Sequence, residues 1–109
     1  NGTTWQSTAL PGGIGQGQTW QSFTTTTRPY GTTFTNSTGK PIMVTHGYGR
    51  NENATVTVGG VAIAVLTHDS NNNTCTYYNF IVPTGATYVI AGTFSSDSLG
   101  TYAYWSELR

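Results

Sequence analysis

Short runs of alternating apolar and polar residues, separated by turn-forming residues, make up most of this 109-residue chain. Residues 42–48 show the alternation well: Ile42, Val44, His46 and Tyr48 fall on one side of the pattern, and Met43 and Thr45 on the other. Successive side chains of a β-strand point to opposite faces of its sheet. The run therefore predicts a strand with one face in a core.

A β-hairpin is predicted over residues 54–66. Valines alternate with threonines in its first half, and Gly59 and Gly60 stand between the two halves. Paired glycines readily adopt the positive φ of a two-residue hairpin turn. The returning half, from Val61, is apolar on both faces. We therefore expect that strand to be buried on both sides, either centrally in a sandwich or against another subunit.

No stretch of the chain shows a helical period, and turn signals recur at regular spacing. Strands are expected over residues 19–24, 32–36, 42–48, 54–58, 61–66, 74–82, 87–93 and 101–108. About eight short strands in this rhythm are typical of an all-β, antiparallel β-sandwich of a jelly-roll-like kind. Residues 1–16, rich in Gly, Thr and Gln, are interpreted as a linker or lead-in strand from a preceding domain, and residues 17–109 as the sandwich.

Charge is scarce in this chain. Only 7% of its residues are charged and the formal net charge is zero, whereas soluble domains carry about 25% charged residues. The four basic residues are scattered, which argues against nucleic acid as a partner. No apolar run is long enough to span a bilayer, so membrane insertion is not expected. The single Cys75 excludes an internal disulfide and is predicted to be a small buried hydrophobe.

Three segments carry a family resemblance. Residues 17–21, 31–36 and 38–44 read Gly-Gln-Thr-Trp-Gln, Gly-Thr-Thr-Phe-Thr-Asn and Thr-Gly-Lys-Pro-Ile-Met-Val, and the chain ends in Trp-Ser-Glu-Leu-Arg. In this order they resemble the C-terminal receptor-binding (tip) domains of bacteriophage and prophage tail fibres and tailspikes. The resemblance runs from Gln16 onward, although residues 47–73 match only in their strand-turn rhythm.

The resemblance implies a location and partners. Tip domains of this kind assemble as parallel homotrimers at the host-facing, extracellular end of the virion tail, after synthesis in the bacterial cytoplasm. The implied ligand is a surface polysaccharide or lipopolysaccharide of the bacterial host. The segments that resemble the family are turns and strands, so we expect specificity to lie elsewhere.

Two predicted loops have the composition of a sugar site, in which aromatic faces stack on the ring and polar side chains bond its hydroxyls. They cover residues 47–53 and 68–73, the second continuing into Tyr77 and Tyr78. Because one hairpin separates the strands before them, the loops are expected at the same end of the sandwich. The candidate ligand-binding residues are Tyr48, Arg50, Asn51, Glu52, Asn53, His68, Asp69, Asn72 and Tyr77.

Catalytic and metal-binding patterns are not apparent. The four acids, Glu52, Asp69, Asp97 and Glu107, show no spacing that pairs two carboxylates or a nucleophile with its base. We expect a non-enzymatic domain without a cofactor and without a metal site inside one chain. One alternative stays open, in which three copies of one histidine bind a metal on a trimer axis.

The two tryptophans in the family-like segments, Trp20 and Trp105, are expected to anchor the sandwich or a subunit contact rather than a ligand. The main alternative function uses the same core without a glycan site. It is a structural module that trimerises and caps a tailspike whose upstream domain cleaves polysaccharide.

Overall fold

Eight strands form the described part of the fold. The computed structural model describes residues 13–24, 26–48, 53–67, 76–92 and 104–109. The strands are β1 (Trp20–Phe23), β2 (Phe34–Thr35), β3 (Ile42–Tyr48), β4 (Asn53–Val58), β5 (Val61–Thr67), β6 (Thr76–Val82), β7 (Thr87–Ala91) and β8 (Tyr104–Leu108). Each lies in or within a residue of an expected range, which confirms the all-β prediction. The described residues contain no helix capable of spanning a membrane.

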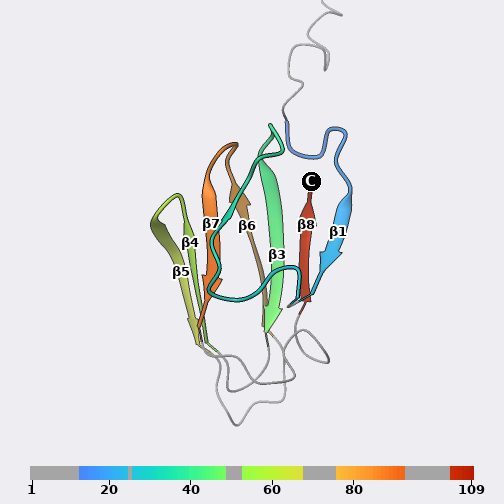
Figure 1. The fold of residues 1–109 in the computed structure, drawn as a ribbon. Coiled ribbons are helices and arrows are strands. Elements are labelled where there is room, and N and C mark those ends of the chain that lie inside the picture. Colours follow the sequence, from blue (N-terminus) through green and yellow to red (C-terminus); the bar gives the residue numbers. More distant parts are fainter. Residues whose placement is uncertain (1–12, 25, 49–52, 68–75, 93–103) are drawn as a thin grey trace, which may run out of the picture.

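The strands pair as a folded antiparallel ribbon. Strand β1 pairs with β8, β2 with β7, β3 with β6 and β4 with β5. Two further antiparallel pairs, β3 with β8 and β4 with β7, join these into sheet A (β1-β8-β3-β6) and sheet B (β2-β7-β4-β5). This strand order is the eight-stranded jelly roll, so the predicted sandwich architecture is confirmed (Figure 1).

The sandwich has two different ends. Strands β3, β5 and β7 run in the same direction, so β3 and β5, which precede the two predicted loops, finish at the same end (Figure 1). We call this the loop end. The opposite end holds Arg109, which exchanges two backbone hydrogen bonds with Thr19. Residues 13–19 therefore lead into β1 far from the loop end.

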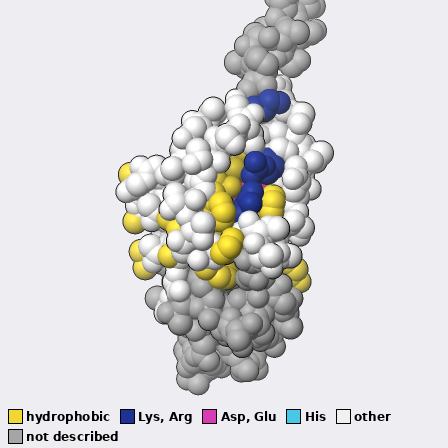
Figure 2. Space-filling model, viewed as in Figure 1, with side chains coloured by type: hydrophobic (Ala, Val, Ile, Leu, Met, Phe, Trp, Pro, Cys, Tyr) yellow, Lys and Arg dark blue, Asp and Glu magenta, His cyan; other side chains and the backbone are white. Residues whose placement is uncertain are grey.

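Strand β5 lies at the edge of sheet B. Its hairpin turn is as predicted, with φ of 60° at Gly59 and 82° at Gly60. The expected central burial of β5 is wrong, because β4 pairs with β5 on one side and with β7 on the other. Val61, Ile63 and Val65 are 62%, 47% and 73% exposed, and Figure 2 shows hydrophobic side chains on that flank. The other predicted environment for these β5 residues, contact with another subunit, stays a prediction.

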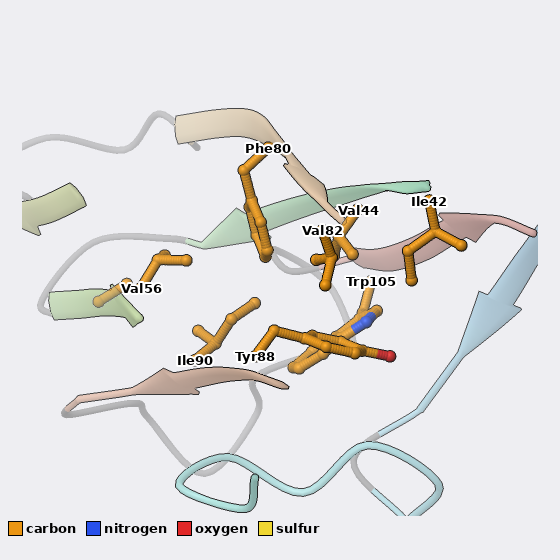
Figure 3. Close-up of a cluster of buried hydrophobic side chains, with 9 residues drawn as sticks. Ile42, Val44, Val56, Phe80, Val82, Tyr88, Ile90 and Trp105 are labelled. Carbon is orange, nitrogen blue, oxygen red and sulfur yellow. The ribbon is translucent and has the colours of Figure 1, made fainter. Parts of the chain in front are cut away.

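The core lies between the two sheets and is built from alternate residues of their strands (Figure 3). Its fully or almost fully buried members are Ile42, Val44, Ala54, Val56, Phe80, Val82, Tyr88, Ile90 and Trp105. The predicted inner face of β3 is confirmed for Ile42, Val44 and His46, which are buried, whereas the side chain of Tyr48 lies outside the described structure. Trp105 anchors the core, as expected. Trp20 is 53% exposed and lies outside the core, so its predicted role as an anchor of the sandwich is wrong.

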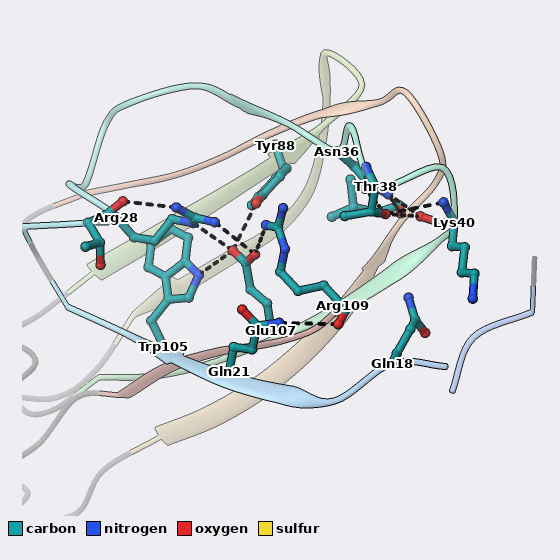
Figure 4. Close-up of polar contacts among 12 residues, drawn as sticks. Gln18, Gln21, Arg28, Asn36, Thr38, Lys40, Tyr88, Trp105, Glu107 and Arg109 are labelled. Carbon is teal, nitrogen blue, oxygen red and sulfur yellow. Dashed lines mark hydrogen bonds and ion pairs between the residues drawn. The ribbon is translucent and has the colours of Figure 1, made fainter. Parts of the chain in front are cut away.

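A buried asparagine holds the end of the sandwich opposite the loop end. The amide nitrogen of Asn36 donates to the carbonyls of Lys40, Val82 and Pro83 at 2.7, 3.0 and 3.2 Å. Its Oδ1 accepts from the backbone and hydroxyl of Thr38 (Figure 4). These bonds join the β2–β3 turn to the β6–β7 turn, which accounts structurally for the Asn-Ser-Thr-Gly-Lys-Pro segment.

Candidate functional site

The nine predicted ligand-binding residues are only partly described. Tyr77 lies in β6 of sheet A and Asn53 begins β4 of sheet B, and both are exposed. The backbone of Tyr48 ends β3 opposite Thr76. Arg50, Asn51, Glu52, His68, Asp69 and Asn72 lie outside the described residues, as do Cys75 and Asp97. Their predicted roles stay predictions.

The outer face of sheet A carries an aromatic row next to the loop end. The strand alternation that buries His46 and Trp105 turns their neighbours outward. In the register, Gly47 lies between Tyr77 of β6 and Tyr104 of β8. We call Tyr77, Gly47 and Tyr104 the aromatic row.

The two tyrosines lie side by side over the glycine. Their ring centroids are 6.1 Å apart and the ring planes differ by 31°. A Cβ atom at position 47 would lie 2.5 Å from two carbons of the Tyr77 ring, so the ring occupies the space that any other residue would need. Tyr77 and Tyr104 are nevertheless 55% and 54% exposed. The result is an aromatic platform open to solvent.

The sequence signals for two members of this row were weak. Neither Gly47 nor Tyr104 is among the predicted ligand-binding residues, although Gly47 falls where the predicted strand 42–48 meets the predicted loop 47–53, and Tyr104 falls in the last predicted strand. A glycine inside an alternating strand often marks close approach of another group, and here that group is the Tyr77 ring. The neighbour relation with Tyr104 depends on pairing between strands remote in sequence, which the local pattern does not contain.

A polar row and a hollow lie beside the aromatic row. The next outward side chains lie two residues from the aromatic row, on the side away from the loop end. They are Ser22, Ser106, Thr45 and Asn79, paired across the sheet in that order. Thr45, Ser106 and Trp20 line a shallow hollow of about 320 Å³. Two hydroxyl side chains and the Trp20 indole thus line a depression that is accessible from solvent.

An apolar row completes the outer face of sheet A. Trp20 pairs with Leu108, Leu108 with Met43, and Met43 with Ile81. Trp20 and Ile81 are about half exposed. Within the described part of this face, all three rows consist of uncharged residues.

Glu107 forms a densely bonded, charged polar centre in the described structure. Its carboxylate is fully buried and accepts hydrogen bonds from Arg28 Nε at 2.9 Å and Nη2 at 3.2 Å. It also accepts from Tyr88 Oη at 2.9 Å, Trp105 Nε1 at 2.9 Å and Arg109 Nη1 at 2.6 Å (Figure 4). We call these five residues the Glu107 centre.

These bonds keep the carboxylate ionised. Burial by itself would raise the pKa of Glu107, but the hydrogen bonds from Arg28, Trp105, Arg109 and Tyr88 outweigh it and lower the pKa. Burial, with the charge of Glu107, raises the pKa of Tyr88 to about 12. The Arg28 guanidinium also lies 4.0 Å from the centroid of Phe23 and 4.9 Å from that of Phe34. A carboxylate held in this way is suited to joining strands and poorly suited to proton transfer.

His46 is part of the interior. Its Nε2 lies 2.8 Å from the hydroxyl of Tyr30, and its ring contacts the Trp105 ring edge-on at a centroid distance of 5.7 Å. A fully buried imidazole cannot face a trimer axis, so the metal alternative is wrong for His46. His68 lies outside the described residues. Elsewhere in the described structure, no three potential metal ligands lie together.

Comparison with protein-family models, curated proteins and solved structures gave no match to this chain.

Proposed function

We propose that the chain is a non-enzymatic receptor-binding domain of the tail-fibre or tailspike kind, which attaches a virion tail to a bacterial surface glycan. The observation that carries the proposal is the pair of exposed tyrosines laid over Gly47 on the outer face of sheet A. The segments that resemble tip domains supply the biological setting.

The chemistry of the face suits a sugar. A pyranose ring has an apolar face of C–H groups and a rim of hydroxyls, so it binds where an exposed aromatic face adjoins hydrogen-bonding side chains. The aromatic row adjoins Ser106, Thr45 and Asn79 at the spacing of alternate residues in a strand, about 7 Å. One ring can therefore stack on a tyrosine while its hydroxyls reach the polar row.

The position of the platform also fits attachment. The aromatic row lies within two residues of the segments 49–52, 68–75 and 93–103, which contain most of the predicted ligand-binding residues. Residues 13–19 enter at the opposite end of the sandwich. The predicted ligand-binding residues in these segments, Asn51 and Asn72 among them, would add contacts that select one glycan.

Three copies would compensate for weak single sites. One exposed sugar site gives low affinity, and linking three raises avidity without a new contact. The exposed valines and isoleucine of β5 offer an uncharged surface for the subunit contact. The trimer therefore places its interface on sheet B and leaves the outer face of sheet A free.

Binding to an array of bacterial O-antigens and capsular polysaccharides tests the proposal. We expect Tyr77→Ala and Tyr104→Ala each to weaken binding about tenfold, because each removes an aromatic face. Tyr77→Phe keeps the ring and should retain binding. Binding that is unaffected by both alanine variants would place the site elsewhere.

A second candidate is the structural capping module, and the exposed apolar strand β5 favours it. This candidate predicts the same trimer, with no glycan bound by this 109-residue chain itself. Depolymerase activity of the fragment alone would contradict both candidates. The array and an assay of polysaccharide cleavage therefore separate the three outcomes.

A further inference from the structure

We propose that the ligand is an uncharged oligosaccharide that lies along the strands of sheet A, from the aromatic row, across the hollow, to a second stacking position at Trp20. This inference rests on the proposed glycan-binding function and names its ligand class and its second contact.

The aromatic row and Trp20 are separated by more than the length of one sugar ring. Trp20 belongs to the row of Met43, four residues along β3 from Gly47, which corresponds to about 13 Å. The hollow between them is lined by Thr45 and Ser106, and Trp20 forms its third wall. A chain of several pyranoses that stacks at both ends would place its middle hydroxyls over these side chains.

The composition of the face selects against a charged ligand. Arg28 and Arg109, the nearest arginines among the described residues, bond to Glu107, and Lys40 donates to the carbonyl of Gln16. An acidic polysaccharide placed on these three rows would lose hydration without gaining an ion pair from any described residue of the face. A neutral glycan loses only hydroxyl hydration, which the polar row replaces.

The arrangement of rows favours a sugar over a second protein chain. The centre of a subunit interface is typically its most apolar part, with a polar rim. On this face the order is reversed, because the hydroxyls of Ser106 and Thr45 lie in the middle and the aromatic groups at the two sides. The apolar surface of β5 matches a protein contact better.

The test measures how affinity depends on chain length. Oligosaccharides of increasing length would be cut from the neutral polysaccharide that the array identifies, and titrated against the parent protein and two variants. In the parent, affinity should rise once the chain spans both positions. Trp20→Ala should remove that gain, about tenfold, and leave the shortest oligosaccharide unaffected. Trp20→Tyr keeps an aromatic face and should retain most of the gain.

Quenching of tryptophan fluorescence is a second readout, which does not require Trp20→Ala to fold. In a Trp5→Phe background the remaining tryptophans are Trp20 and the buried Trp105, so long oligosaccharides should shield the exposed indole from acrylamide quenching. Loss of binding in Tyr77→Ala with no effect of Trp20→Ala would overturn this inference while the proposed function stands. Binding of acidic polysaccharides alone would overturn the neutral ligand, and binding of none would overturn both. An indole shielded before sugar is added would show that another copy covers this face.

Discussion

At the scale of single residues, Glu107 joins parts of the fold that are far apart in sequence. Its carboxylate bonds to Arg28 in the β1–β2 connection, to Tyr88 in β7, to Trp105 in its own strand β8 and to Arg109 at the chain end. Both sheets therefore meet at one carboxylate. The aromatic rings around Arg28 shield that contact from water, which strengthens it.

Replacing Glu107 with glutamine tests this role. Glu107→Gln leaves two partly buried arginines without their carboxylate, and losing one partner of a buried ion pair typically costs about 3–5 kcal/mol. We expect urea denaturation to show a loss of about 3 kcal/mol. The double variant Glu107→Leu with Arg28→Met should recover part of it, since apolar replacement of a whole pair is often neutral. A loss under about 0.5 kcal/mol for Glu107→Gln would show that the centre contributes little.

The same centre predicts a loss of stability in acid. The folded-state pKa of Glu107 is lowered, so its contribution is fully present above the pKa of an unfolded glutamate, about 4.3. The contribution is lost as the pH falls below that value and through the lower folded-state pKa. Denaturation midpoints measured from pH 7 to pH 2 should fall more steeply in the parent than in Glu107→Gln. Parallel curves would contradict the assignment.

The residue-scale predictions from the sequence succeeded where the information is local. The alternation in 42–48 predicts which side chains of β3 are buried. The position of Trp105 in the last predicted strand likewise indicates that it anchors the sandwich or a subunit contact. The Glu107 centre brings Arg28 and Tyr88 to the last strand from 79 and 19 residues away, so the sequence carries no local sign of it. Tyr77 was a candidate ligand contact on composition alone, whereas Tyr104 becomes its neighbour only through the β8–β3–β6 register.

At the scale of elements, β5 is the strand whose surroundings the sequence leaves undecided. Its apolar residues on both faces indicate burial, and the pattern fits a central strand and a subunit contact equally well. The jelly-roll pairing places β5 at the edge of sheet B, because β4 pairs with β5 on one side and with β7 on the other. An exposed, uncharged edge strand tends to associate with another chain.

A charge on β5 tests the subunit contact. We expect the parent to sediment as a trimer at micromolar concentration and Val65→Glu to sediment as a monomer, since a carboxylate would be buried without a partner. Val65→Thr, with a similar shape and no charge, should stay trimeric. Circular dichroism of both variants should match the parent. A parent that sediments as a stable monomer would remove the assembly proposal.

At the scale of the whole molecule, the jelly roll holds the segment before β1 and the proposed glycan platform at opposite ends. Residues 13–19 and Arg109 lie at one end, held by the Thr19–Arg109 hydrogen bonds and near the Asn36 network. The aromatic row lies next to the other end. The two segments 31–36 and 38–44, on which the family resemblance partly rests, build strands and a turn, consistent with a structural role for that motif.

The most direct test of the central claim is an amide NMR titration of the labelled protein with the glycan that the array identifies. The account predicts chemical-shift changes at Gly47, Tyr77 and Tyr104, spreading toward Thr45 and Ser106, with little change at the β4–β5 turn. Changes confined to the opposite end of the sandwich, or to β5, would contradict it.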